Sequence, residues 1–506
     1  MRQRIKKINN YIDNPITCQE NVFKYLIKKG MKTKFGREHS FQKITDYESF
    51  KNQIPVSNYE DLIPYVKEVQ MGGRDILWPS NVKWFAKSSG TTNSKSKFIP
   101  ITKESLNDCH LKGGKDMLSL YENNFPNTNL YDGKGLMLGG SIVRSKNEKY
   151  KEGDLSAILL DEFPFWVNYH RVPDITTAIM KDWERKIDKI ASQALKENIT
   201  NLTGVPSWML ILLKKVLFLS GKNNISEVWP NLELYMHGGV NFEPYRKQFE
   251  TLIPSEKMNY LEGYNASEGF LAIQDTNENQ GMLLMLDHGI FYEFIPIEEY
   301  REGKRDAIDL SKVELYKNYA LIINTNGGLW RYVIGDVIQF TTIFPFRIKI
   351  VGRIKNCINT FGEELMIHNT DTAISISCRK HNCSITDYSV APLFIGNTSG
   401  GHQWFIEFEK KPSELNLFMK ELDEQLKKLN SDYEAKRYNN LIIKFPELVT
   451  IENNEFYLWL KENGRLGGQY KIPRLSEKRD IAENILSIKR SFQQKTLLSQ
   501  NNYNEK

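Results

Sequence analysis

A polar loop between two apolar segments constrains the fold of this chain most strongly. The loop reads Lys87-Ser88-Ser89-Gly90-Thr91-Thr92-Asn93-Ser94-Lys95-Ser96-Lys97. Val82, Trp84 and Ala86 alternate before it, and Phe98–Ile101 follow it, which predicts a strand on each side. Hydroxyl, backbone N–H and ammonium groups on one loop suit a polyphosphate, whose oxygens accept hydrogen bonds and whose charge needs cations. Gly90 permits close backbone approach. An ordinary polar surface hairpin is the alternative.

The loop is not a Walker motif, because the G-x-x-x-x-G-K-[ST] pattern that opens a helix is missing. A phosphate-binding loop between two strands indicates a different nucleotide-binding architecture.

The length of the chain predicts more than one domain. It has 506 residues, far more than one small core needs. Its 40% hydrophobic and 12% aromatic residues are typical of a globular protein. The net charge of +6 comes from 68 basic and 62 acidic residues without a basic stripe. We therefore expect no nucleic-acid partner.

Cysteine usage and hydropathy predict a cytoplasmic protein without a membrane partner. The five cysteines are scattered, which is typical of reduced thiols. Cys378 and Cys383 flank His381 without a second ligand cluster, so packing thiols are favoured over a metal site. The N-terminus lacks the apolar core of a signal peptide. The longest apolar run, Trp208 to Leu219, is broken by two lysines and is too short to span a bilayer.

A second candidate segment is an apolar strand, Leu232 to Val240, that runs into a double glycine. Gly238 and Gly239 offer backbone without side chains, against which a flat ring can lie, although double glycines are also common in turns. His237 precedes them and could act as a base or switch; a lone histidine on a strand is more often a structural hydrogen bonder.

Two further segments carry an aromatic ring and carboxylates. In Tyr264-Asn265-Ala266-Ser267-Glu268-Gly269, the tyrosine can stack on a base and Glu268 can hold Mg²⁺ through its carboxylate. Asp336 follows Gly335 at the edge of a predicted strand, where it can accept hydrogen bonds from both hydroxyls of a ribose; capping a turn is the alternative.

Trp166 and Trp208 could line a pocket for an acyl group, although core packing is the more common role of a single tryptophan.

The chain beyond Phe346–Val351, a predicted strand, has the pattern of a smaller α/β unit. Strands are predicted at Trp404–Glu407 and Phe456–Leu460, and a helix around the apolar face from Phe418 to Leu429. A glycine-rich turn then precedes Lys471 and Arg474. This basic segment is either a mobile arm that delivers positive charge or an exposed loop.

Four motifs in this order resemble the adenylate-forming superfamily. They are the hydroxyl-rich loop, Tyr264–Gly269, Arg331-Tyr332-Val333-Ile334-Gly335-Asp336 and Gly352-Arg353-Ile354-Lys355. Within that superfamily the chain resembles the bacterial members of the Gretchen Hagen family of acyl acid amido synthetases. Four further segments match sequence motifs of that family: Phe35-Gly36-Arg37-Glu38-His39, Gly204-Val205-Pro206-Ser207-Trp208, Gly238–Tyr245 and Tyr292-Glu293-Phe294-Ile295-Pro296. The resemblance covers residues 14 to 475. Asn265 departs from it, since glycine usually follows the tyrosine.

The resemblance implies a fold and a domain organisation. The expected fold is α/β: residues 1–354 form a large domain of mixed sheets with flanking helices and a β-rich part, which binds ATP and the acyl acid. Residues 355–506 form a smaller mobile α/β lid, hinged near 353–357.

The resemblance also implies residue roles. Lys97, Glu268 and Lys471 are the expected catalytic residues, with Glu268 as the Mg²⁺ ligand and Lys471 as the arm lysine. The expected ATP- and AMP-binding residues are Ser88, Ser89, Gly90, Thr91, Thr92, Gly238, Gly239, Tyr264, Asn265, Ser267, Asp336 and Arg353. Trp166, Trp208 and His237 are weaker candidates for the acyl pocket.

The implied activity is a two-step ligation with ATP and Mg²⁺. A small carboxylic acid is adenylated, and its acyl group is then transferred to the amine of an amino acid. The expected partners are these small molecules, with the chain as a monomer or weak homodimer. An acyl-CoA ligase that shares the first step and an inactive nucleotide-binding protein remain the alternatives.

Overall fold

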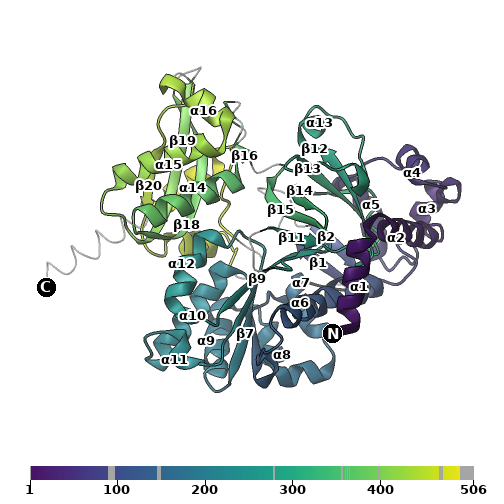
Figure 1. Cartoon of the computed structure of the whole chain (residues 1–506), viewed down its shortest axis with the longest axis horizontal. Helices are drawn as coiled ribbons and strands as arrows, with labels where there is room; N and C mark the ends of the chain where they lie inside the picture. The colour runs from purple at the N-terminus through teal and green to yellow at the C-terminus, as the bar shows by residue number, and fades with distance from the viewer. Residues whose placement is uncertain are drawn as a thin grey trace. The chain divides into compact units, whose positions relative to one another are not determined.

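The structure is a computed structural model that describes residues 2–88, 97–144, 150–276, 280–354, 357–358, 360–361, 363, 365–395, 399–440, 442–466 and 471–490. Packing divides the chain into two units (Figure 1). The first unit comprises Met1–Val240 and Leu252–Ile350, and the second comprises Asn241–Thr251 and Val351–Lys506.

One eleven-stranded sheet forms the centre of the first unit, in the order β12-β13-β14-β15-β11-β10-β9-β8-β7-β3-β6. Its strands are β3 (Lys134–Met137), β6 (Arg171–Val172), β7 (Ile199–Thr203), β8 (Leu234–His237), β9 (Asn259–Ala266), β10 (Gly269–Ile273), β11 (Met282–Leu284), β12 (Ile290–Pro296), β13 (Asn318–Thr325), β14 (Tyr332–Ile343) and β15 (Phe346–Arg353).

The pairing changes direction at β9. This strand is parallel to β8 and antiparallel to β10. The strands on the β8 side, β7, β3 and β6, are also parallel to their neighbours. Because the carboxyl ends of parallel strands meet at one edge, the segments that follow β7, β8 and β9 lie along the same edge of the sheet.

A four-stranded sheet, β2-β1-β5-β4, belongs to the same unit. It consists of β1 (Trp84–Ser88), β2 (Lys97–Ile101), β4 (Ile142–Arg144) and β5 (Lys151–Gly153). β1 and β2 are antiparallel, which confirms that the hydroxyl-rich loop connects two strands.

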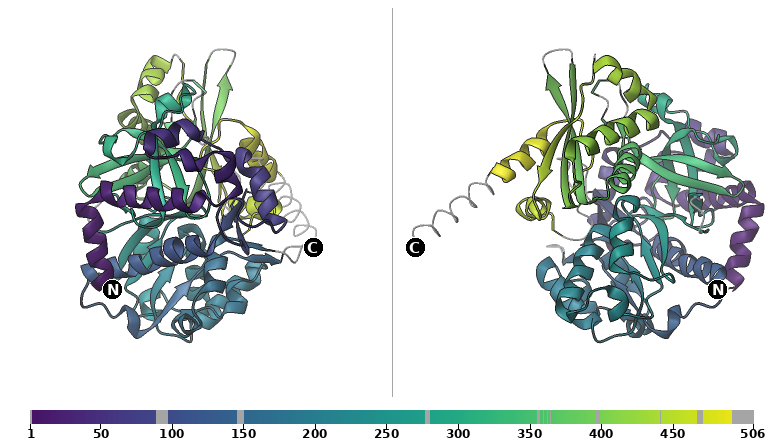
Figure 2. Two further views of the ribbon diagram at one scale, coloured as in Figure 1. Left: turned by 90° about the vertical axis from the view of Figure 1, so that its right-hand side faces the viewer. Right: turned by 60° about the vertical axis from the view of Figure 1, so that its left-hand side comes forward.

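Helices accompany these two sheets. They are α1 (Arg2–Asp13), α2 (Pro15–Gly30), α3 (Lys34–Glu38), α4 (Tyr47–Gln53), α5 (Tyr59–Gln70), α6 (Leu111–Asn124), α7 (Leu155–Glu162), α8 (Ile175–Ala178), α9 (Trp183–Ala194), α10 (Pro206–Ser220), α11 (Ile225–Val228) and α13 (Ile297–Arg301), with a π-helix η2 (Ser105–His110) and the 3-10 segments η1 (Phe41–Lys43), η3 (Leu130–Asp132), η4 (Phe165–His170) and η5 (Leu310–Lys312). Figure 2 shows α1 and α2 together on one side of the unit.

Local sequence signals explain where several helices begin and end. α10 starts at Pro206, whose fixed φ and missing N–H suit a first helical position, and it stops at Gly221, which takes φ +66°. Among the described residues, no helix has both the length and the apolarity that crossing a membrane requires.

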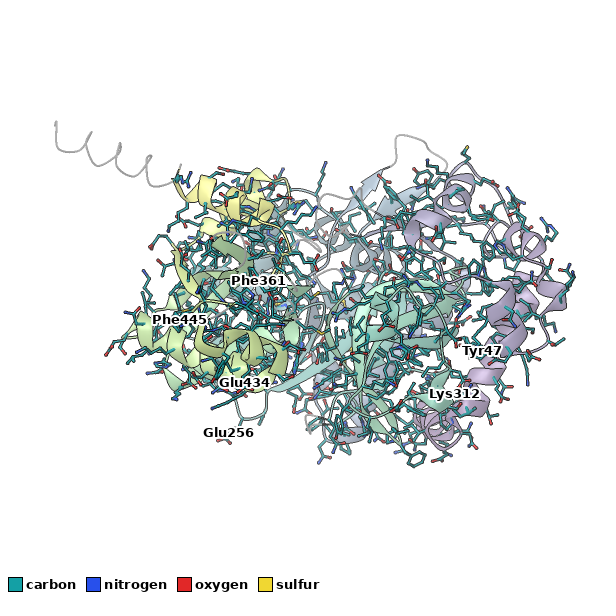
Figure 3. The ribbon with its side chains drawn as sticks, turned by 90° about the horizontal axis from the view of Figure 1, so that it is seen from above. Tyr47, Glu256, Lys312, Phe361, Glu434 and Phe445 are labelled. Carbon is teal, nitrogen blue, oxygen red and sulfur yellow. The ribbon has the colours of Figure 1, made fainter. Side chains whose placement is uncertain are left out.

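A buried ion pair joins two of the motifs noted in the sequence. Nε of Arg331 donates to Oε1 of Glu293 at 3.0 Å, and both side chains are almost fully buried. Tyr47, labelled in Figure 3, donates to the same carboxylate at 3.0 Å, and Asn324 donates to its other oxygen at 2.9 Å. The guanidinium also donates to the carbonyl oxygen of Ile54 at 2.7 Å. These bonds fix the start of β14.

The second unit has its own core around a three-stranded sheet, β18-β19-β20. Its elements are α12 (Glu243–Leu252), β16 (Cys357–Ile358), β17 (Leu365–Met366), α14 (Ile367–Lys380), β18 (Ser384–Ile395), β19 (Ser399–Lys410), α15 (Leu415–Leu429), α16 (Ser431–Arg437), η6 (Tyr438–Asn440), β20 (Glu447–Ile451) and α17 (Glu455–Glu462). The predicted strand at Trp404–Glu407 and the predicted helix ending at Leu429 are confirmed.

The predicted strand at Phe456–Leu460 is wrong, since these residues lie in α17. The side chains buried there include Phe456, Trp459 and Leu460, which are spaced three and four residues apart and therefore share one face of a helix. In a run this short, apolar residues fit both the two-residue period of a strand and the 3.6-residue period of a helix, and tertiary packing decides between them.

We expect Glu293→Ala to destabilise the first unit by about 3–5 kcal/mol, because it leaves the buried guanidinium of Arg331 without its carboxylate. Urea unfolding measures this loss. Glu314→Ala is the matched control: its ion pair with Lys317 is exposed at the surface, so its loss should stay below about 1 kcal/mol. Equal losses in the two variants would contradict the structural importance of the buried pair.

Candidate functional site

The ends of the hydroxyl-rich loop are fixed by strand pairing. Ser88, the last residue of β1, lies opposite Lys97, the first residue of β2. The predicted phosphate-binding residues Ser89, Gly90, Thr91 and Thr92 lie outside the described residues.

A tyrosine hydroxyl connects Lys97 with Glu268. The ammonium group of Lys97 donates to Oη of Tyr332 at 3.0 Å, and that hydroxyl lies 3.5 Å from Oε1 of Glu268. Nζ of Lys97 also lies 5.7 Å from the ring centre of Tyr59 and 5.5 Å from that of Tyr332. Two aromatic faces thus favour a cation at this point. The structure therefore places two predicted catalytic side chains, one from β2 and one from the turn between β9 and β10, beside one buried hydroxyl.

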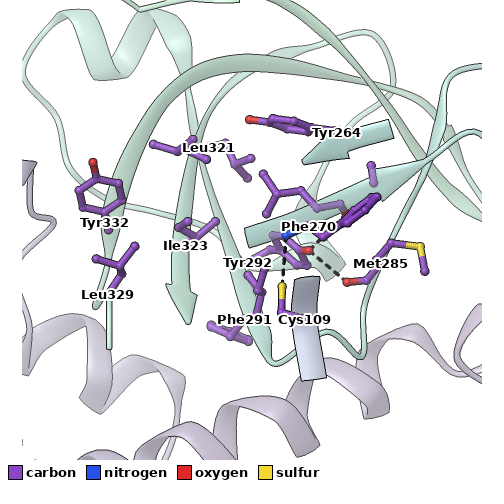
Figure 4. Packing of buried hydrophobic residues seen from close by; sticks show 14 of the residues in the cluster. Cys109, Tyr264, Phe270, Met285, Phe291, Tyr292, Leu321, Ile323, Leu329 and Tyr332 are labelled. Atoms are coloured by element: carbon purple, nitrogen blue, oxygen red, sulfur yellow. Dashed lines mark hydrogen bonds between the residues drawn. The ribbon is translucent and has the colours of Figure 1, made fainter. Parts of the chain in front are cut away.

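A second tyrosine connects β9 with β14. Oη of Tyr264 donates to Oδ2 of Asp336 at 2.5 Å, and both residues are buried. Three strands, β15, β11 and β10, separate β14 from β9 in the order of the sheet. A direct hydrogen bond across them requires the sheet to curve strongly there. Figure 4 shows Tyr264 and Tyr332 at the border of the apolar cluster in the first unit.

The double glycine follows β8 at the carboxyl edge of the parallel strands. A Cβ on Gly238 would lie 2.3 Å from the carbonyl oxygen of Gly263, so any side chain would force β8 and β9 apart. Gly239 takes φ +78°, which favours glycine. His237 is buried, and its ring lies 5.4 Å from that of Tyr235.

The π-helix η2 packs against the segment that carries Tyr264 and Glu268. Nδ1 of His110 lies 3.1 Å from Oδ1 of Asn265. Because an amide oxygen only accepts, Nδ1 donates in this bond. The thiol of Cys109 accepts a hydrogen bond from the backbone N–H of Phe270 at 3.1 Å (Figure 4). A π-helix often marks a functional site.

Burial keeps the His110 ring neutral. Desolvation lowers its pKa from 6.5 to about 4, and the bond with Asn265 opposes this shift only in part. In the described part of the chain, Nε2 of His110 has no hydrogen-bond partner. Asn265, by contrast, is exposed. At residue 265, where glycine is usual in the family, the asparagine side chain therefore forms a hydrogen bond with a buried histidine.

The other predicted residues belong to several different elements. Ser267 is buried in the turn between β9 and β10. Trp166 is 55% exposed on η4, whereas Trp208 is buried with its ring 4.7 Å from that of Trp183. Arg353 and Lys471 belong to the second unit, where both are half-buried.

Two residues of this site had no role in the sequence-based prediction. Tyr332 lies four residues before Asp336, and side chains at even spacing on a strand share a face. The sequence could therefore have placed Tyr332 on the same side of the strand as the predicted ribose ligand. No comparable signal marks His110, since a single histidine in a segment of mixed polarity has no distinctive pattern.

A cluster of metal-type ligands lies elsewhere in the first unit. Donor atoms of Asp116, Asp287 and His288 lie within 4.8 Å of one another, a grouping found among the described residues. The guanidinium of Arg4 already pairs with both carboxylates, at 2.5 Å each. This cluster is therefore a buried charge network that holds α1, and it offers a metal no free carboxylates.

The low pKa of His110 predicts the direction in which stability changes with pH. Between pH 6.5 and about 4 the unfolded chain binds a proton at this ring and the folded chain does not, so stability falls as the pH falls through this window. We expect His110→Gln to remove this part of the acid destabilisation, about 3 kcal/mol. Urea unfolding at several pH values measures it. His170→Gln, on an exposed ring, is the control; the same change in both variants would contradict the prediction.

Comparison with known proteins found curated relatives of this chain. The curated relatives include the indole-3-acetic acid-amido synthetase GH3.3 of Arabidopsis thaliana, which is 22% identical over 90% of this chain and 88% of its own length. They also include the jasmonoyl–L-amino acid synthetase GH3.5 of Oryza sativa subsp. japonica, 23% identical over 63% of this chain and 67% of its own length.

Solved structures share the fold. The GH3.15 acyl acid amido synthetase matches with a TM-score of 0.78 at 15% identity, covering 96% of both chains. A 2-hydroxyisobutyryl-CoA ligase in its postadenylation state matches with a TM-score of 0.61 at 11% identity, covering 94% of this chain and 91% of its own. The predicted α/β fold is therefore confirmed.

Family models cover most of the chain. The model of the GH3 family N-terminal domain matches residues 4–258, that of the central domain matches 283–353, and that of the C-terminal domain matches 368–480. The first of these alone spans half of the chain, and the three follow one another as N-terminal, central and C-terminal domains. This chain belongs to the GH3 family.

Proposed function

We propose that this chain is an ATP-dependent acyl acid amido synthetase, a ligase that joins a small carboxylic acid to the amine of an amino acid. The observation that carries the proposal is the placement of Lys97 and Glu268 on either side of the Tyr332 hydroxyl. Membership in the GH3 family and the names of the amido synthetase relatives support an amino acid as the acceptor.

The proposed reaction has two steps and needs no side-chain nucleophile. A carboxylate oxygen of the acid attacks the α-phosphorus of ATP, and the bond to pyrophosphate breaks. The amine nitrogen then attacks the acyl carbon, AMP leaves and the nitrogen loses a proton. Positioning and charge neutralisation supply the catalysis.

The first unit would hold the nucleotide. Ser88, with the loop that follows it, would bind the phosphates, and the ammonium of Lys97 would offset their charge as pyrophosphate leaves. Tyr332 accepts from Lys97 and can donate to Glu268, so it would fix both groups. Mg²⁺, held by Glu268, would add positive charge beside the phosphate oxygens.

The nucleoside would lie along the carboxyl edge of the parallel strands. Gly238 and Gly239, which have no side chains, would lie against the adenine, and Tyr264 would stack on it. The carboxylate of Asp336, which accepts from Tyr264 through one oxygen, would bind the ribose hydroxyls. Asn265, Ser267 and Arg353 complete the proposed nucleotide-binding set, and Trp166, Trp208 and His237 remain weaker candidates for the acyl pocket.

The second unit would supply the lid. The proposed boundary lies at 354/355 with the hinge near 353–357, and Lys355 and Asn356 lie outside the described residues. Lys471 would reach the transferred group after the lid moves. A cytoplasmic location, a monomer or weak homodimer, and the absence of nucleic-acid and membrane partners remain predictions.

An acyl-CoA ligase is the second candidate, favoured by the fold shared with a CoA ligase. Mass spectrometry separates the two when the protein, ATP and a panel of acids are incubated with amino acids or with coenzyme A. We expect amides and AMP. Thioesters without amides would reject the proposal in favour of the CoA ligase. Stabilisation by ATP–Mg²⁺ without pyrophosphate release for any acid would indicate an inactive nucleotide-binding protein.

Three substitutions test the Lys97–Tyr332–Glu268 arrangement by the rate of pyrophosphate release. Lys97→Ala and Glu268→Gln should each lower adenylation by 10²-fold or more, on the order of ~3 kcal/mol. Tyr332→Phe removes one hydroxyl and should cost about tenfold. Tyr316→Phe, on a ring that is 68% exposed, is the control and should leave the rate unchanged. Losses below about tenfold for Lys97→Ala and Glu268→Gln would contradict the assigned roles.

A further inference from the structure

The second unit contains a helix whose sequence comes from the middle of the chain. α12 follows Gly238 and Gly239 by a few residues, yet it packs with Val351–Lys506 rather than with the residues on either side of it. The chain therefore passes between the two units three times, after Val240, after Thr251 and after Ile350.

A buried arginine connects α12 with the segment that follows Lys471. Arg474 is 7% exposed, and one terminal nitrogen of its guanidinium donates to Oη of Tyr245 in α12 at 2.9 Å. The other terminal nitrogen pairs with Asp371 of α14, and Nε lies 3.7 Å from a carboxylate oxygen of Asp387 in β18. One side chain thus contacts three elements of the unit.

Burial makes these contacts interdependent. Desolvation raises the pKa of Asp387 to about 6, and Arg474 opposes that shift. The guanidinium also lies 4.9 Å from the ring centre of Tyr388, whose hydroxyl donates to Asp371 at 2.5 Å. Removing one partner of such a group leaves an uncompensated charge in the interior.

The backbone around Arg474 is fixed at the same place. Its carbonyl oxygen accepts from the N–H of Val390 at 2.8 Å, and the carbonyl oxygen of Pro473 accepts from the hydroxyl of Ser389 at 2.6 Å. The segment that carries Lys471 is therefore anchored on β18 three residues after the lysine.

α12 is bound to the same strand. Gln248, a buried side chain, donates to the carbonyl oxygen of Ile385 at 2.5 Å, and the exposed Lys247 donates to Oδ1 of Asn382 at 3.1 Å. In Figure 1 α12 and β18 are drawn beside each other, as these bonds require.

We propose that Arg474 is a positioning residue that fixes the Lys471 segment to α12 and makes α12 part of the second unit. Any rotation of that unit must then be accommodated at three connections. One of them, at Val240 and Asn241, begins directly after Gly239. Movement of the lysine segment is thereby coupled to the double glycine proposed to hold adenine. This coupling to catalysis rests on the proposed function, whereas the assignment of α12 does not.

Hydrogen–deuterium exchange of the full chain tests the assignment without any assay of activity. Tyr245→Phe removes the hydroxyl that accepts from Arg474 and keeps the ring. We expect exchange to become about tenfold faster in α12 and in β18 together, and to stay unchanged in β13 and β14. Lys247→Ala, which removes an exposed contact of the same helix, is the control and should change neither.

Three results would overturn the assignment: no change in α12, a change in α12 alone without β18, or faster exchange throughout the chain. Arg474→Gln provides a second variant with the same expected pattern and a larger effect, provided that circular dichroism shows it folded.

Kinetics tests the coupling to catalysis separately. With an active acid and amino acid, Tyr245→Phe should lower kcat about tenfold while the KM for ATP stays within about twofold. Equal kcat in the variant and the original chain would overturn the coupling. If the original chain turned over no acid, the proposed function would fail, and the exchange pattern would still decide where α12 belongs.

Discussion

The buried pair of Glu293 and Arg331 supports the arrangement of the first unit. Arg331 takes φ +43°, a backbone conformation that few side chains adopt, and its side chain is held by Glu293 and by the carbonyl oxygen of Ile54. Tyr332 is the next residue, so its hydroxyl can meet Lys97 and Glu268 only if the turn before β14 keeps this shape. A charged pair is costly to bury, and here the hydrogen bonds of the Glu293 carboxylate and of Nε and Nη1 of Arg331 define one geometry for the strand that carries Asp336.

The position of the candidate site follows from the change of direction at β9. Parallel strands end at one edge of the sheet, and the antiparallel part curves back until β14 reaches β9, as the Tyr264–Asp336 bond shows. Ligands in open α/β sheets bind at such switch points, where loops from neighbouring strands diverge. The backbone contact between Gly238 and Gly263 keeps β8 and β9 close enough for both of their following segments to face one site.

The local pattern predicted much of this arrangement. Alternation before the hydroxyl-rich loop and an apolar run after it predicted a strand on each side, and β1 and β2 confirm both strands. Burial in β1 does not alternate, since Trp84, Phe85 and Ala86 are all buried. Gly238 and Gly239 were predicted as backbone against which a flat ring can lie, and this stays a prediction. The close approach of the Gly263 carbonyl oxygen to Gly238 is visible only in the fold. The apolar run at Phe456–Leu460 was predicted as a strand and is a helix, since burial of one helical face depends on what packs against it.

The sequence by itself determined the family, the chemistry of the candidate groups and most of the strands, because these depend on residue type and near spacing. Tertiary structure alone decided that Tyr332 lies between Lys97 and Glu268, that His110 holds Asn265, and that α12 packs with residues more than a hundred positions further along the chain. The physical reason is common to all three. Each depends on a contact between segments far apart in sequence, and such contacts are selected by the packing of whole sheets and helices, which no local pattern records.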